Sequence, residues 1–103
     1  MSQLNSIRNL IKNNQQRLEM LNKLNIQAVT ISYPVRHTKW AAHQLAIYVP
    51  HQTKNKKLVW KYNGHIGKHY YSFNKAINIA KEFATSNKIL FIYELRNNAE
   101  IFK

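Results

Sequence analysis

The sequence contains no cysteine and no aspartate, and only two glycines and two prolines among its 103 residues. Without cysteine the chain can form no disulfide, iron–sulfur cluster or thiolate zinc site. With 45% hydrophobic and 12% aromatic residues, it is not a disordered or low-complexity chain. No segment approaches the roughly 20 consecutive apolar residues of a membrane span, and we identify no signal peptide. We therefore expect a single cytoplasmic domain, residues 1–103.

Acidic residues are scarce. Sixteen Lys and Arg residues stand against four Glu, which gives a net charge of +12 with His neutral. No acid lies between Glu19 and Glu82, an interval that contains all five histidines and many of the lysines. A field of one sign attracts polyanions. We therefore expect a nucleic-acid partner and no membrane partner, with an acidic protein as the alternative.

Residues 3–24 are predicted to form a helix, because apolar residues recur at helical spacing along them. These residues are Leu4, Ile7, Ile11, Leu18 and Leu21. The spacing also fits a coiled-coil seam, in which Asn14 would set the register of a homodimer through the helix 4–24. The interpretation that we favour is a helix lying on its own sheet, with Asn14 at the edge.

The rest of the chain predicts five strands and a second helix. The strands are expected at 26–33, 44–49, 57–62, 65–72 and 88–95, and the helix at 75–86. Asn63-Gly64 predicts a tight hairpin turn, and the apolar run within 88–95 predicts a strand in the middle of the sheet. The order α-β-β-β-β-α-β indicates an α+β domain, with a mainly antiparallel sheet of about five strands and two helices on one face. The polar tail 96–103 is expected to fray.

The predicted hairpin 57–72 carries the residues best suited to a nucleic acid. On its first strand the aromatic Trp60 and Tyr62 share one face, and Lys57 and Lys61 share the other. If the aromatic face meets the core, the lysines form an exposed cationic row. If it faces outward, the aromatic rings can stack on unpaired bases. We favour the first arrangement, because large aromatic residues in a small domain usually belong to the core.

The predicted interface combines this hairpin with the basic segment 36–40. Lysine suits phosphate contacts, whereas base reading more often uses Arg, Asn or Gln. We therefore predict a small, non-enzymatic protein that binds duplex DNA in preference to RNA, mainly through phosphates. Its composition is typical of phages and mobile elements. The predicted interface residues are Arg36, Lys39, Trp40, Lys54, Lys56, Lys57, Lys61, Lys68 and Tyr70.

Residues 57–84 resemble the three-strand-plus-helix DNA-binding domain of arm-site-binding phage integrases and plant APETALA-type factors. In that family basic and aromatic strands lead through a glycine turn to a helix of the pattern Y/S-F-x-x-x-x-A-x-x-x-A. The pattern is approximated here at Ser72, Phe73, Ile77, Ala80 and Ala84. The resemblance implies a sheet that enters the major groove. The positions that it implies as contacts are Lys57, Val59, Lys61, Lys68 and Tyr70.

Two histidines lie close together in the second half of the hairpin and suggest a first alternative function, an RNA-binding protein or a small metal-independent, toxin-like ribonuclease. In such enzymes His transfers the proton and a cation stabilises the pentacoordinate phosphate. The catalytic residues would be His65, Lys68, His69 and Tyr70. A second alternative is a basic phage-type inhibitor of an acidic or RNA-loaded host complex. We expect no metal and no cofactor, because no carboxylate stands near the histidines and no phosphate-binding glycine loop is present.

Overall fold

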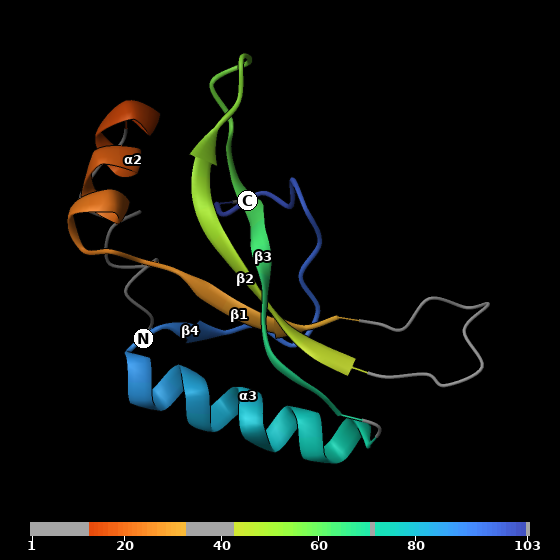
Figure 1. Cartoon of the computed structure of the whole chain (residues 1–103). Coiled ribbons are helices and arrows are strands. Elements are labelled where there is room, and N and C mark those ends of the chain that lie inside the picture. The colour runs from red at the N-terminus through yellow and green to blue at the C-terminus, as the bar shows by residue number, and fades with distance from the viewer. Residues whose placement is uncertain (1–12, 33–42, 71, 103) are drawn as a thin grey trace.

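The computed structural model describes residues 13–32, 43–70 and 72–102. The elements in chain order are α2 (Asn14–Lys23), β1 (Ala28–Ile31), β2 (His43–Gln52), β3 (Leu58–Tyr70), α3 (Phe73–Asn87) and β4 (Leu90–Phe91) (Figure 1). The strands form one sheet in the order β3-β2-β1-β4, in which only the β1–β4 pair is parallel. The α+β class is confirmed, but within the described residues the sheet is mixed and has four strands, so the prediction of about five strands is wrong. None of the described helices has the length and hydropathy needed to cross a bilayer.

Of the two helices that the structure describes, one covers each face of the sheet (Figure 1). On one face a cluster joins the sheet to α3 through Val29, Ile31, Leu45, Ile47, Ala76, Ala80 and Ala84. On the other face a cluster joins it to α2 through Leu21, Ile26, Ala28, Ala46, Tyr48, Leu58 and Trp60. The prediction of two helices on one face is therefore wrong. The physical reason lies in β1, which is buried along its whole length and so needs cover on both sides.

Each helix begins at a polar cap. The side chain of Ser72 accepts the backbone N–H of Lys75 at the start of α3, and the side chain of Asn13 accepts that of Gln15 at the start of α2. Leu21 of α2 is fully buried against the sheet. For residues 14–23 this confirms the interpretation of a helix lying on its own sheet. The backbone of Asn13 is extended, so the prediction of one continuous helix over 3–24 is wrong. The apolar positions Leu4, Ile7 and Ile11 lie outside the described residues.

The segment predicted as a hairpin turning at Asn63-Gly64 is a single strand. β3 pairs antiparallel with β2, and the register shifts between Tyr48 and Ala46 and again between Leu45 and His43. At both shifts β3 supplies the extra residues, as in a β-bulge. Gly64 and Gly67 lie in these two interruptions with φ of 101° and 77°. The positive φ that favours a hairpin turn also serves a bulge, which is why the prediction of a turn is wrong.

We expect Gly64→Ala to lower the free energy of unfolding by about 1–2 kcal/mol. No described heavy atom lies within 4 Å of an added Cβ, so the loss would come from backbone strain at φ 101° alone. Urea denaturation followed by circular dichroism measures it, with the neighbouring Asn63→Ala as the control. A loss no larger than that of the control would contradict the strained geometry.

The apolar segment 88–95 lies at an edge of the sheet and not in its middle. Within this segment only Leu90–Phe91 forms a strand, β4, which pairs with β1. The centre of the sheet is occupied by β1 and β2. The run is apolar for another reason, since its residues serve both layers of the core. Ile89 and Phe91 contact the α3 cluster, and Leu90 and Ile92 contact the α2 cluster.

The tail runs along the outer edge of β3 and does not fray over residues 97–101. The backbone N–H of Asn98 donates to the carbonyl of Trp60, and the N–H of Trp60 donates to the carbonyl of Ala99, both at 2.8 Å. The N–H of Ile101 donates to the carbonyl of Leu58 at 3.0 Å. These bonds cover an edge that would otherwise be open to pairing.

Candidate nucleic-acid interface

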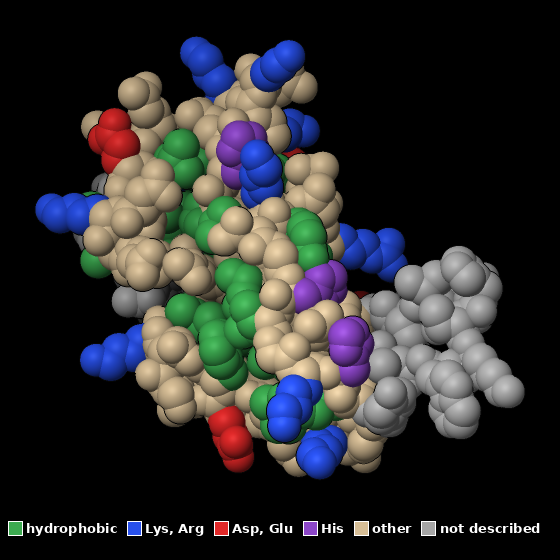
Figure 2. Space-filling model, in the orientation of Figure 1, with side chains coloured by type: hydrophobic (Ala, Val, Ile, Leu, Met, Phe, Trp, Pro, Cys, Tyr) green, Lys and Arg blue, Asp and Glu red, His purple; other side chains and the backbone are tan. Residues whose placement is uncertain are grey.

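Four of the predicted interface lysines gather at the end of the β2–β3 hairpin. Lys54, Lys56 and Lys57 lie in its connecting loop, Lys61 lies on β3, and all four are exposed. We call these four residues the tip cluster. Figure 2 shows basic side chains around this end of the molecule.

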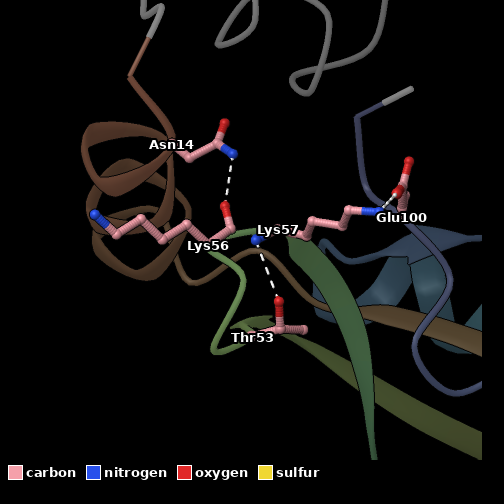
Figure 3. A network of polar contacts seen from close by, with 5 residues as sticks. All are labelled: Asn14, Thr53, Lys56, Lys57 and Glu100. Atoms are coloured by element: carbon pink, nitrogen blue, oxygen red, sulfur yellow. Dashed lines mark hydrogen bonds and ion pairs between the residues drawn. The ribbon is translucent and has the colours of Figure 1, made fainter.

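The loop is held by contacts on both of its sides (Figure 3). The side-chain amide of Asn14 donates to the carbonyl of Lys56 at 2.8 Å, and the N–H of Lys57 donates to the Thr53 hydroxyl at 3.2 Å. Asn14 therefore joins α2 to the hairpin within the chain, and the homodimer through the helix 4–24 stays a prediction.

The side chains of Lys56 and Lys57 leave the loop in different directions. Lys56 extends past α2, whereas Lys57 extends toward the tail (Figure 3). There the ammonium of Lys57 lies 3.5 Å from a carboxylate oxygen of Glu100. Both side chains are exposed, so this ion pair contributes little to stability, but it offsets part of the positive charge of the tip cluster.

Lys68 and Tyr70 lie at the other end of β3. At roughly 3.3 Å per residue, Lys68 is on the order of 30 Å along the strand from Lys57. Tyr70 is half-buried and contacts the α3 cluster. Because 57–70 is nearly all one extended strand, the structure separates these two residues from the tip cluster. Arg36, Lys39 and Trp40 lie outside the described residues.

The favoured arrangement of β3 holds for Trp60 and the two lysines, but not for Tyr62 and Val59. Trp60 is 2% exposed and belongs to the core on the α2 side, whereas Lys57 and Lys61 are exposed. Tyr62 on the aromatic face is 39% exposed. Val59 is 3% exposed, so it does not present the side chain to solvent that the family resemblance implies.

The four residues of the ribonuclease hypothesis are not brought together. His65 pairs in register with Ala46, whose side chain lies on the α2 side. Tyr70 pairs with His43 and contacts the α3 cluster. The pleat and the two bulges thus place these residues on opposite faces of the sheet. Lys68 and His69 are exposed within the second register interruption.

No group of three or more His, Cys, Asp or Glu residues in the described part of the chain could hold a metal ion.

A pocket on the α2 side of the sheet was missed by the sequence analysis. It has a volume of about 290 Å³, and we call it the tyrosine pocket. Its lining includes Tyr48, Tyr62, His65, Arg96 and Asn97. Nothing in the sequence indicates it, because the first bulge and the return of the tail bring these residues together.

The rings of the tyrosine pocket contact one another edge to face. The ring centroids of Tyr48 and Tyr62 lie 5.7 Å apart, and those of Tyr62 and His65 lie 5.1 Å apart. The Tyr62 hydroxyl is hydrogen-bonded to Nδ1 of His65. Burial, and then the neighbouring Tyr62, raise the pKa of the Tyr48 hydroxyl above its ordinary value.

The chain matches no protein-family model, no curated protein and no solved structure.

Proposed function

We propose that the protein binds nucleic acid, and duplex DNA foremost, through the tip cluster. The observation that carries this proposal is the gathering of four exposed lysines at one end of the β2–β3 hairpin. Among the described residues, only Lys57 of these four forms an ion pair. Lys54, Lys56 and Lys61 therefore keep their charge available for phosphates.

The shape of the hairpin supports the same proposal. Its end extends beyond β1 and β4 (Figure 1), with α2 on one face and the tail paired to the edge of β3, so the tip lysines lie on a projecting part of the molecule. Lysine contacts phosphate as a point charge, and phosphate contacts position a protein without reading the bases. The contact of Asn14 with the loop and the pairing of the tail with β3 fix the position of this end relative to the core.

The salt dependence of binding tests the proposal. Four phosphate contacts give a slope of log K against log salt of about −4, since each contributes about −0.9. We expect the triple variant Lys54→Gln, Lys56→Gln and Lys61→Gln to flatten the slope by about 3 and to weaken binding on the order of 100-fold near 0.1 M salt. Fluorescence anisotropy of a labelled duplex across a salt series measures both quantities.

A second triple variant, Lys23→Gln, Lys75→Gln and Lys88→Gln, is the control. It removes the same charge from exposed positions away from the tip. Lys88 also matches Lys56 in backbone conformation, with φ of 56° against 62°. We expect this control to keep a slope near that of the unaltered protein. Equal losses in the two triples would mean that total charge, and not the tip cluster, binds the duplex.

The same titrations with single-stranded DNA and RNA separate the alternatives. Cleavage of the RNA, seen on a gel, would support the ribonuclease hypothesis instead. Absence of binding to all three nucleic acids at low salt would overturn the proposal and favour an acidic protein partner.

A further inference from the structure

The tyrosine pocket brings aromatic and polar side chains together at a place that includes none of the tip lysines. It lies between the sheet and the segment that enters the tail, and it is open to solvent on the side of Tyr62, which is 39% exposed. Its volume of about 290 Å³ is at the small end of the range of ligand pockets. A ligand of a single planar ring system with one polar group fits such a space.

Side chains from two distant segments converge on this pocket. Tyr62 comes from β3, and Asn97 comes from the tail. The side-chain oxygen of Asn97 accepts the backbone N–H of Tyr62 at 2.8 Å, which fixes the tail against the strand. Arg96, the neighbour of Asn97, is exposed and lines the pocket.

The charges and rings of the pocket select a class of ligand. No Asp or Glu is among its described lining residues, whereas Arg96 is cationic and forms no ion pair with any described residue. Arginine binds phosphate through two parallel hydrogen bonds, and exposed tyrosine and histidine rings stack on bases. The Tyr48 hydroxyl supplies a neutral donor nearby. This set complements a flat aromatic ring that carries an anionic group.

We propose that the tyrosine pocket binds one unpaired nucleotide, with the base against Tyr62 and the phosphate at Arg96. For a nucleotide within a strand this rests on the proposed binding of nucleic acid at the tip cluster. Tyr62 lies about 13 Å along β3 from Leu58, where the strand begins, so one nucleic acid can reach both places. The tip cluster would bind the phosphates, and the tyrosine pocket would add a preference for nucleic acid that contains an unpaired nucleotide.

Free nucleotides test the pocket without the tip. Nucleoside 5′-monophosphates are titrated into the protein and followed by amide chemical shifts, beside ribose 5-phosphate and inorganic phosphate. We expect the monophosphates to shift the amides of residues 62, 65, 96 and 97, and both Tyr62→Leu and Arg96→Gln to weaken binding about 10-fold. Tyr62→Phe keeps the ring and should bind within about 3-fold of the unaltered protein. Equal shifts with inorganic phosphate would overturn the base contact.

Duplexes test the same pocket within a strand. We expect a duplex with one extra unpaired nucleotide to bind about 10-fold more tightly than the perfect duplex, and Tyr62→Leu to remove this preference while leaving the perfect duplex bound as before. Binding of the perfect duplex with neither a preference for the extra nucleotide nor binding of monophosphates would overturn the pocket and leave the tip proposal standing. Binding of monophosphates without binding of any duplex would overturn the tip proposal and support the pocket as a site for free nucleotides.

Arg96→Gln is the variant that tests the pocket without changing the stability of the fold. Arg96 is exposed, so this variant should unfold at the same urea concentration as the unaltered protein. Full binding of nucleotides by this folded variant would contradict the assignment of the phosphate to Arg96.

Discussion

Replacement of Trp60 by alanine is expected to lower the free energy of unfolding by about 3–5 kcal/mol. The indole is 2% exposed and lies in the cluster that joins the sheet to α2. Its removal forfeits the burial of a large apolar surface and leaves a cavity among side chains that relax only in part. The tail contacts this cluster as well, through Ile101 and Phe102. The cavity would therefore open where the sheet, α2 and the tail meet.

Urea denaturation followed by far-ultraviolet circular dichroism measures the loss, since the signal does not depend on the indole. Small domains unfold with about 5–15 kcal/mol, so Trp60→Ala could leave too little folded protein to measure. Trp60→Phe, with an expected loss of about 1–2 kcal/mol, keeps the test available. Tyr93→Ala is the exposed aromatic control, because Tyr93 is 50% exposed. A loss for Trp60→Ala no larger than for Tyr93→Ala would contradict the described core.

Leu21→Ala should cost about 3–4 kcal/mol, because Leu21 is fully buried where α2 meets the sheet. Leu24, the residue that caps the same helix, is 47% exposed. We expect Leu24→Ala to cost less than about 1 kcal/mol. The two variants remove the same atoms within one turn of chain, so their difference isolates burial.

Urea midpoints of the two leucine variants give the comparison directly. Similar losses in both would mean that α2 does not lie on the sheet through Leu21. If α2 does not lie on the sheet, Asn14 cannot hold the β2–β3 loop through its hydrogen bond to Lys56. In that case we expect folded Leu21→Ala to bind duplex DNA with the same salt dependence as the unaltered protein.

The parts of the fold that local patterns control were predictable. Helix α3 has a polar cap at Ser72 and a row of alanines at helical spacing, and both signals are short in range. Which face of the sheet each helix covers depends on β1, whose four residues are all buried. The sequence 28–31 is too short to reveal burial on two faces. The segment 88–95 was misplaced because an apolar run is equally suited to the centre of a sheet and to an edge that two layers cover.

The predictability of the candidate site follows the same division. Alternation along the strand predicted that Lys57 and Lys61 are exposed, which is confirmed, but it also placed Val59 on the exposed face, where the structure has it buried. The separation of the tip lysines from Lys68 could not be anticipated, because Asn63-Gly64 favours a turn and a bulge alike. The tyrosine pocket joins Tyr62 to Asn97 through one side-chain hydrogen bond, and contacts between residues so far apart leave no periodic signal.

The pairing of the tail with β3 also has a consequence for the order of events during synthesis. Trp60 leaves the ribosome roughly forty residues before its partner Ala99, and chains emerge at about 5–20 residues per second. The outer edge of β3 therefore has no strand to pair with until residues 97–101 have left the ribosome as well. Until then this edge is open to pairing with another chain, so closing it is one of the last steps in completing the sheet.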